Sequence, residues 1–134
     1  MACTLTYATL RIFSSEVSPE QITELIGFNP TKVKSINPDS KYKHERELNS
    51  WAYSTKNLSN STDNVEHLEI IINKLQGKSE VMNNFDQLNC STDIFCFWDS
   101  NGQGGPSMKV DLMSRLVALN LSISWDMYFD EESA

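Results

Sequence analysis

The chain has 134 residues, with 18 acidic and 11 basic side chains, and a formal net charge of −7. That length predicts one domain over residues 1–134, and 40% apolar residues suffice for a core without metal ions or disulfides. The negative charge argues against nucleic acid and anionic membranes as partners. Short apolar runs and the lack of a secretory signal predict a cytoplasmic protein.

A strand and a capped helix are predicted first. Residues 6–13 alternate apolar and polar side chains, which is the period of a half-buried strand. For a helix over residues 19–26, Ser18 is the expected N-cap, Gln21 completes a capping box, and Gly27 suits a left-handed C-cap. The apolar stripe expected to face the core is formed by Ile22, Leu25 and Ile26.

Two short strands and a long loop follow. Residues 31–36 predict a strand whose lysines would protect a sheet edge from further pairing. Residues 37–49 are so polar and charged that we expect an exposed loop. Residues 50–55 predict a strand with Trp51 and Tyr53 on one face.

A long apolar stripe predicts a helix over residues 64–88, with Asp63 and Glu66 at its cap. An unbroken helix of this length would extend about 37 Å, roughly the width of the whole domain. We therefore expect a bend or break near Gly77. The stripe is formed by Val65, Leu68, Ile72, Leu75, Met82 and Phe85.

Three elements are predicted in the C-terminal third. Residues 91–98 are apolar on both faces, which predicts a central strand covered on most of both sides. Residues 121–129 alternate strictly, which predicts a half-buried strand with Asp126 and Tyr128 on its polar face. Between them, residues 107–120 predict a helix with the apolar stripe Val110, Met113, Leu116 and Val117.

The element order βαββαβαβ predicts an α+β fold. Its first six elements match a ferredoxin-like βαββαβ core, which the last helix and strand extend as a C-terminal αβ unit. We expect a mixed sheet with helices mainly on one face. If the second face is open, its polar side chains would suit the binding of another protein.

The segment FWDSNGQGGPSM, residues 97–108, holds three of the five glycines and raises the question of a phosphate-binding loop. A Walker-type loop needs a lysine that is missing here, and a dinucleotide fingerprint needs a glycine where Ser107 stands. We interpret residues 102–107 as a connector in which Ser107 caps the next helix. An anion or ligand site at that helix start remains the alternative.

No catalytic or metal-binding motif stands out. Asp93, Asp99 and Asp126 lie in or near strands, where solvated carboxylates are commoner than catalytic pairs. No spacing predicts a zinc site, and we expect no metal, no cofactor and no catalytic residue. The cysteines are expected to be reduced, and a nucleophile pair of Cys96 with a histidine is disfavoured because an apolar strand raises a thiol pKa.

Several segments resemble a known family. They are YATLRIFSSEVSPEQITELIGFNPT, Trp51, VEHLEIIINKL, FCFWDSNGQGGPSM and LMSRLVALNLSISWDMYF, which together cover most of the chain. They resemble the small bacterial proteins of the domain of unknown function DUF4279. The segment 31–50 departs from the Gly-bearing basic patch expected there. The resemblance implies a fold and a bacterial cytoplasm, and it carries no established activity.

The expected function is that of a non-catalytic immunity protein. Small acidic bacterial proteins without a catalytic motif often neutralise toxins of contact-dependent or polymorphic systems, and many of these toxins are basic nucleases. Opposite charge would speed their encounter. The residues expected to block the toxin active site are Asp126, Tyr128, Asp130, Glu131 and Glu132, then Asp99, with Asn101, Gln103 and Ser107 as possible loop contacts.

Two alternatives remain open. One is a small-ligand-binding or enzymatic domain built around the Gly-rich loop 102–107, with Trp98 and Asp99 in the same pocket. The other is an interaction module that has no toxin as its partner.

Overall fold

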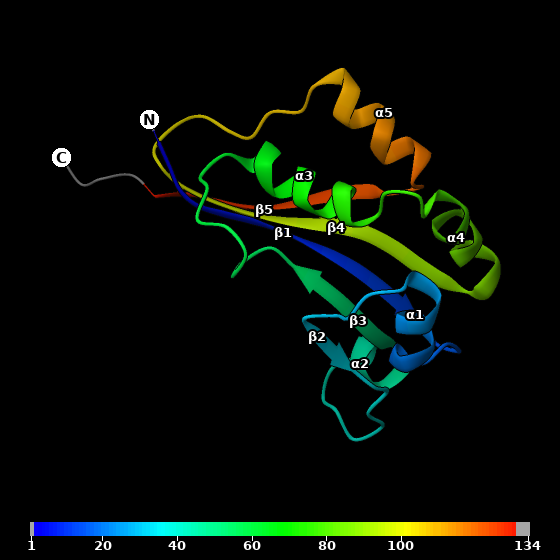
Figure 1. The fold of residues 1–134 in the computed structure, drawn as a ribbon. Coiled ribbons are helices and arrows are strands. Elements are labelled where there is room, and N and C mark those ends of the chain that lie inside the picture. Colours follow the sequence, from blue (N-terminus) through cyan, green and yellow to red (C-terminus); the bar gives the residue numbers. More distant parts are fainter. Residues whose placement is uncertain (1, 131–134) are drawn as a thin grey trace.

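The computed structural model describes residues 2–130, which form one five-stranded sheet with its helices (Figure 1). The strands are β1 (Ala2–Ser14), β2 (Lys32–Lys34), β3 (Asn49–Ser54), β4 (Cys90–Asn101) and β5 (Ser122–Asp130). The helices are α1 (Pro19–Ile26), α2 (Lys43–Glu47), α3 (Asn64–Lys74), α4 (Ser79–Asn84), the 3₁₀ helix η1 (Phe85–Leu88) and α5 (Val110–Ala118). Within the described residues, no helix has both the length and the apolar character needed to cross a bilayer.

The strand order in the sheet is β2-β3-β1-β4-β5. All neighbouring strands are antiparallel except β4 and β5, which run parallel. Thus β1 and β2 run in one direction, and β3, β4 and β5 run in the other. The predicted α+β class and mixed sheet are confirmed. The ferredoxin-like arrangement itself stays a prediction, and α2 is a helix that the predicted order does not contain.

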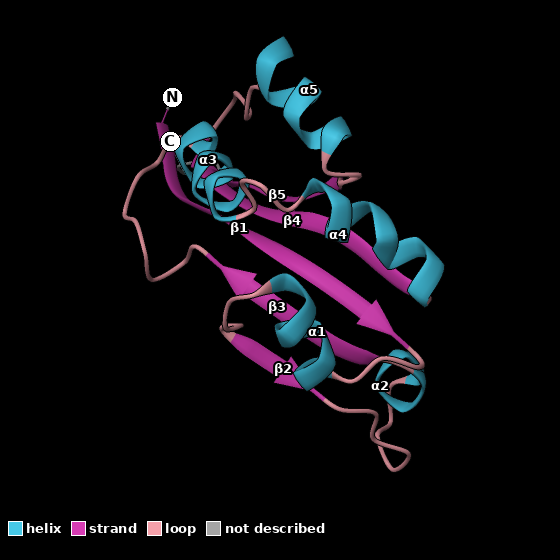
Figure 2. Cartoon of the chain, turned by 45° about the vertical axis from the view of Figure 1, so that its right-hand side comes forward, coloured by secondary structure: helices cyan, strands magenta, loops and turns pink. Residues whose placement is uncertain are grey.

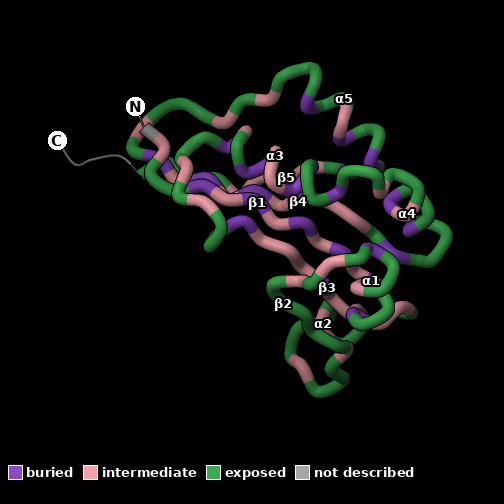
Figure 3. Tube along the Cα trace, in the orientation of Figure 1, coloured by how far each residue is buried: buried purple, intermediate pink, exposed green. Residues whose placement is uncertain are grey.

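Helices α1, α3, α4 and α5 cover one face of the sheet (Figures 1 and 2). On β1, the buried side chains are the even-numbered ones, among them Leu10 and Ile12, because successive residues of a strand point to opposite faces. Burial concentrates where these strands meet the helices (Figure 3). The helices contribute to this core Ile22, Ile26, Leu68, Ile71, Ile72, Leu75, Met82, Phe85, Leu112 and Leu116.

The local signals around α1 act as predicted. The Ser18 hydroxyl accepts the backbone N–H of Gln21, and the Gln21 side chain accepts the backbone N–H of Ser18. Gly27 ends the helix at a φ of 86°, in the left-handed region. The predicted stripe is wrong at Leu25, which is 43% exposed. The helix rests on the sheet through Ile22 and Ile26, four residues apart, and Leu25 lies to the side of this pair.

The predicted break near Gly77 is confirmed. Helix α3 ends at Lys74 and α4 begins at Ser79, with Gly77 between them at a φ of 77°. Two shorter helices can each follow the twisted sheet, whereas one straight rod would leave it. Most of the predicted stripe is buried, Val65 is partly buried, and Ile71 joins the core as well.

The start of the last helix was predicted wrongly. Helix α5 begins at Val110, and Ser107 does not cap it. Instead, the Asn64 side chain at the start of α3 holds the backbone of Ser107: Nδ2 donates to the carbonyl over 2.9 Å, and Oδ1 accepts the N–H over 3.3 Å. The two bonds engage both backbone groups of Ser107, so the chain here follows α3 before it turns into α5.

The predicted apolar stripe of α5 is also partly wrong. Leu112 and Leu116 are the buried side chains, whereas Val110 and Val117 are each 77% exposed and Met113 is 44% exposed. The helix thus contacts the core through two leucines four residues apart, one turn along the same side. Its outer side presents three apolar side chains to solvent.

Candidate functional site

The second face of the sheet is mostly uncovered. Of the helices in the described part of the chain, only α2 lines this face, beside β2 and β3. We call it the open face, and its side chains include Tyr7, Arg11, Phe13, Asp93, Phe95, Phe97, Asp99, Asp126 and Tyr128. The prediction that β4 is covered on most of both sides is wrong, because α1, α3, α4 and α5 lie on the side of its even-numbered residues and α2 lies beside β2 and β3.

Aromatic rings cross the open face from β1 to β5. Tyr7 stacks on Phe97 with ring centroids 5.1 Å apart, and Phe97 contacts Tyr128 at 5.6 Å. The guanidinium of Arg11 lies over the Phe95 ring at 4.5 Å. These neighbours leave Phe95 and Phe97 half-buried without any helix above them. The apolar residues on the second side of β4 therefore form an aromatic surface and not a second buried layer.

The parallel register of β4 and β5 gathers most of the predicted toxin-binding residues. Asp126 lies beside Phe97, Tyr128 beside Asp99, and Asp130 beside Asn101. Paired residues of neighbouring strands point to the same face, so these carboxylates and Tyr128 share the open face. We call Asp99, Asp126, Tyr128 and Asp130 the acidic edge. The other two predicted residues, Glu131 and Glu132, lie outside the described residues.

Carboxyl groups lie close together within the acidic edge. The side chain of Asp130 raises the pKa of Asp99 through a hydrogen bond, with partial desolvation and the Asp130 charge acting in the same direction. Oδ1 of Asp99 is enclosed and has no hydrogen-bond partner within residues 2–130. Tyr128 donates a long hydrogen bond of 3.4 Å to Asp126. The Asp130 carboxylate is exposed, so a cation from another molecule can pair with the edge there.

The Gly-rich loop continues the sheet before it leaves it. Asn101 is still paired with Asp130, and the N–H of Gly102 donates to the Asp130 carbonyl over 3.1 Å. Gly102 and Gly104 adopt φ angles of 92° and 119°, which favour glycine. Gln103 is exposed. The connector interpretation therefore agrees with the geometry.

The pocket suggested for a ligand at this loop is not assembled as expected. Trp98 points to the helix-covered face and is buried, whereas Asp99 points to the open face. Consecutive residues of one strand cannot face a common pocket on one side of the sheet. The loop 102–107 therefore does not unite with both of these side chains.

A cavity of about 610 Å³ lies at the other end of the open face, between α2 and strands β1, β2 and β3. Its charged lining consists of Arg11, Lys32, Lys34, His44 and Glu45. We call it the basic cavity. The sequence correctly predicted Lys32 and Lys34 on an edge strand, but it did not predict this cavity. One wall of the cavity is formed by α2, which was predicted as loop.

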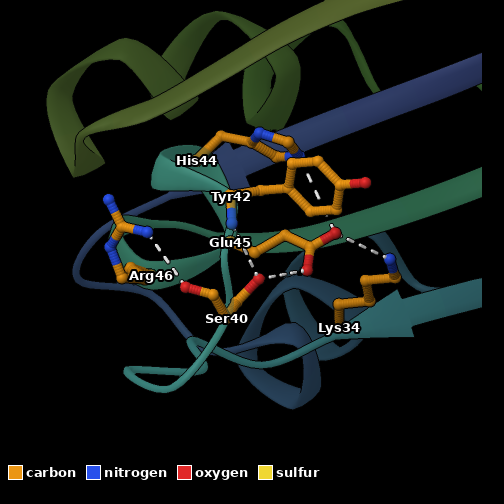
Figure 4. A network of polar contacts seen from close by, with 6 residues as sticks. All are labelled: Lys34, Ser40, Tyr42, His44, Glu45 and Arg46. Atoms are coloured by element: carbon orange, nitrogen blue, oxygen red, sulfur yellow. Dashed lines mark hydrogen bonds and ion pairs between the residues drawn. The ribbon is translucent and has the colours of Figure 1, made fainter.

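Helix α2 was predicted as loop and is held by polar contacts around Glu45 (Figure 4). One Glu45 oxygen accepts from the Ser40 hydroxyl over 2.7 Å, and the other accepts from the Lys34 ammonium over 3.1 Å. His44 Nε2 lies 3.8 Å from the same carboxylate. The Ser40 and Lys34 hydrogen bonds lower the pKa of Glu45, so it is an anion at neutral pH. Lys34 on β2 thus connects the helix to the sheet.

The disfavoured thiol–histidine pair does not form. Cys96 is buried on the helix-covered face, and burial raises its pKa to about 12, so it stays a thiol. His67 is engaged by the Thr55 hydroxyl at 2.6 Å and the Ser61 carbonyl at 2.8 Å. His44 lies at the basic cavity beside Glu45. All three cysteines are free thiols.

Comparison with known proteins identifies a family. The profile of the family described as "Domain of unknown function (DUF4279)" matches residues 4–130. No curated protein and no solved structure matches the chain. The matched region contains every strand from β1 to β5 apart from the first residues of β1, and it includes both the acidic edge and the basic cavity. The chain therefore belongs to the DUF4279 family.

Proposed function

We propose that this chain is an immunity protein that binds a basic protein toxin, such as a nuclease, and blocks its active site. The observation that carries the proposal is the acidic edge, which lies on the edge strand β5 and its neighbour β4, next to a row of half-buried aromatic rings that ends at the exposed Tyr128. Protein partners use such combinations, because aromatic side chains provide buried area and charges provide orientation.

The edge position of β5 adds a second means of recognition. Because β5 is the last strand of the sheet, its outer backbone groups have no partner strand within the described chain. An extended segment of another protein can pair with such an edge. Exposed apolar side chains flank it on the helical side, at Phe129, Val110 and Val117. A partner strand that pairs with β5 would lie beside Phe129 and bury part of its exposed surface.

The charge of the edge favours a basic partner over a second copy of this chain. A two-fold antiparallel pairing centred on β5 would place Asp126 opposite its own copy, and like charges opposite each other destabilise a sheet. Asp99 and Asp130 already repel each other within one chain. A lysine or arginine from a basic toxin would relieve that repulsion by pairing with the exposed carboxylate of Asp130.

The experiment is to purify the basic protein encoded beside this chain and measure its affinity calorimetrically at low and high salt. We expect tight binding that weakens with salt, suppression of the toxin's activity, and a loss of about tenfold or more for Asp126→Asn combined with Asp130→Asn. The matched control is Glu20→Gln combined with Glu80→Gln, which removes two exposed carboxylates from the helical side.

Two outcomes would contradict the proposal at different levels. Tight binding that is equally insensitive to both double variants would exclude the acidic edge as the contact. Failure to bind or inhibit any basic protein encoded beside this chain would reject the immunity function itself.

A further inference from the structure

The basic cavity results from side-chain sizes on three neighbouring strands. In the sheet register, Ala52 of β3 lies between Lys32 of β2 and Arg11 of β1. One pair further along, Ser50 lies between Lys34 and Phe13. Small residues thus form the floor, and long side chains rise on both sides of it. Helix α2 supplies the remaining wall, with His44 and Glu45.

Most of the charges around this floor are compensated. Arg11 is paired with the carboxylate of Asp93, and Lys34 is paired with Glu45. Lys32 has no ion pair within the described residues. The charges of Arg11, Lys32, Lys34, Asp93 and Glu45 sum to one uncompensated positive charge.

The rest of the lining suits an apolar body. Phe13, Leu48 and Ala52 contribute apolar surface, and Ser35, Asn37 and Ser50 offer neutral hydrogen-bonding groups. Arg11 is held against the Phe13 and Phe95 rings and by Asp93, so it forms a fixed wall with little freedom to follow a ligand. A volume of about 610 Å³ is within the usual range of small-molecule sites.

We propose that the basic cavity binds a small organic monoanion, a carboxylate attached to an apolar ring or chain. The carboxylate lies over Ala52, between the side chains of Lys32 and Arg11, and the apolar body lies against Phe13 and Leu48. Lys32 supplies the charge that selects an anion.

The charge count separates this ligand from neighbouring classes. A nucleotide or polyphosphate carries several negative charges, and one uncompensated cation does not balance them. A cationic ligand would be repelled by Lys32. It would also find no free carboxylate in the cavity, because Glu45 already accepts from Lys34 and Ser40. The proposal is independent of toxin binding, because the acidic edge lies on β4 and β5, at the opposite edge of the same sheet face.

The test is a titration of the protein with 2-naphthoate, in which the backbone amide NMR spectrum is recorded at each addition. Its neutral analogue 2-naphthamide tests the charge, and inorganic phosphate tests the apolar body. We expect saturable shifts from naphthoate that are confined to β2, β3, α2 and the end of β1. The amide and phosphate should each bind at least about fivefold more weakly.

Variants identify the recognising charge. Lys32→Gln should weaken naphthoate binding about fivefold or more, whereas Lys109→Gln, an exposed lysine before α5, should leave it unchanged. Lys32 is exposed, so this change should preserve the spectrum of the fold. The proposal is overturned if naphthoate produces no saturable shifts there, if the amide or phosphate binds equally well, or if the two lysine variants behave alike.

Discussion

Arg11 of β1 and Asp93 of β4 form a two-bond ion pair across the open face, with Nε donating to Oδ1 over 2.8 Å and Nη2 donating to Oδ2. The two residues are direct partners in the antiparallel register. The pair lies between the acidic edge and the basic cavity. By neutralising Arg11, Asp93 reduces the positive charge at the cavity, and by neutralising Asp93, Arg11 limits the negative charge of β4.

This pair should contribute modestly to stability. Its side chains are 31% and 21% exposed, so solvent screens the attraction. In a cycle of Arg11→Gln, Asp93→Asn and the double variant, we expect a coupling of about 0.5–1 kcal/mol at low salt. Urea unfolding at low and high salt measures it. A coupling that does not decrease with salt would contradict the electrostatic explanation.

The Asn64 contact should stabilise the loop before α5. Asn64→Ala removes both hydrogen bonds to Ser107, and we expect a loss of about 1–2 kcal/mol in the free energy of unfolding. Hydrogen exchange should also become faster at residues 103–109. The control Asn60→Ala removes an exposed asparagine and should change stability by less than about 0.5 kcal/mol. Unchanged exchange in the loop would show that Asn64 does not hold it.

His67 should be a structural residue. The Ser61 carbonyl can only accept, so Nε2 carries the proton, and Nδ1 accepts from the Thr55 hydroxyl, which itself accepts the N–H of Ala8. Both side chains are almost fully buried. His67→Leu leaves the Thr55 hydroxyl without an acceptor and the Ser61 carbonyl without its donor, and we expect a loss of about 2–3 kcal/mol in the free energy of unfolding, measured by urea.

The exposed His44 provides the control for this change. His44→Gln should alter stability by less than about 0.5 kcal/mol. Equal effects of the two histidine variants would disprove the structural role of the buried chain of hydrogen bonds.

The acidic edge should reduce stability at neutral pH. The pKa of Asp99 is raised above its ordinary value of 3.8, so the folded state disfavours the ionised form. Stability is therefore lowered above the unfolded pKa and recovers as the pH falls through the folded pKa. We expect Asp99→Asn to stabilise the protein at about pH 7 and to have little effect at about pH 3. Thermal unfolding across pH measures this difference.

A matched carboxylate makes the comparison specific. Asp39→Asn, in the exposed loop before α2, should change stability little at either pH. If Asp99→Asn destabilised the protein at neutral pH, the repulsion between Asp99 and Asp130 would not be the dominant effect.

Two neighbouring residues test the orientation of α5. Leu116→Ala should lower the free energy of unfolding by about 2–4 kcal/mol because Leu116 is buried in the core. Val117→Ala should have an effect below about 0.5 kcal/mol because Val117 is 77% exposed. Chemical unfolding of both variants measures the difference. Similar losses would mean that both residues face the core, as the sequence pattern predicts.

Short-range patterns in the sequence determined much of the local structure. The capping box of Ser18 and Gln21, the left-handed Gly27 and the break near Gly77 all depend on residues a few positions apart. The alternation along β5 correctly assigned Asp126 and Tyr128 to one face. Such signals are readable because helix caps and strand periods are set by neighbouring residues.

Tertiary structure decided where those faces lie and what meets on them. The start of α5 depends on Asn64, which is 43 residues before Ser107, and its buried side depends on how the helix then meets the sheet. The basic cavity exists because the strand order places Lys32, Ala52 and Arg11 side by side and because Glu45 attaches α2 to β2. These contacts join residues far apart in sequence, and only the packing of the whole sheet determines their partners.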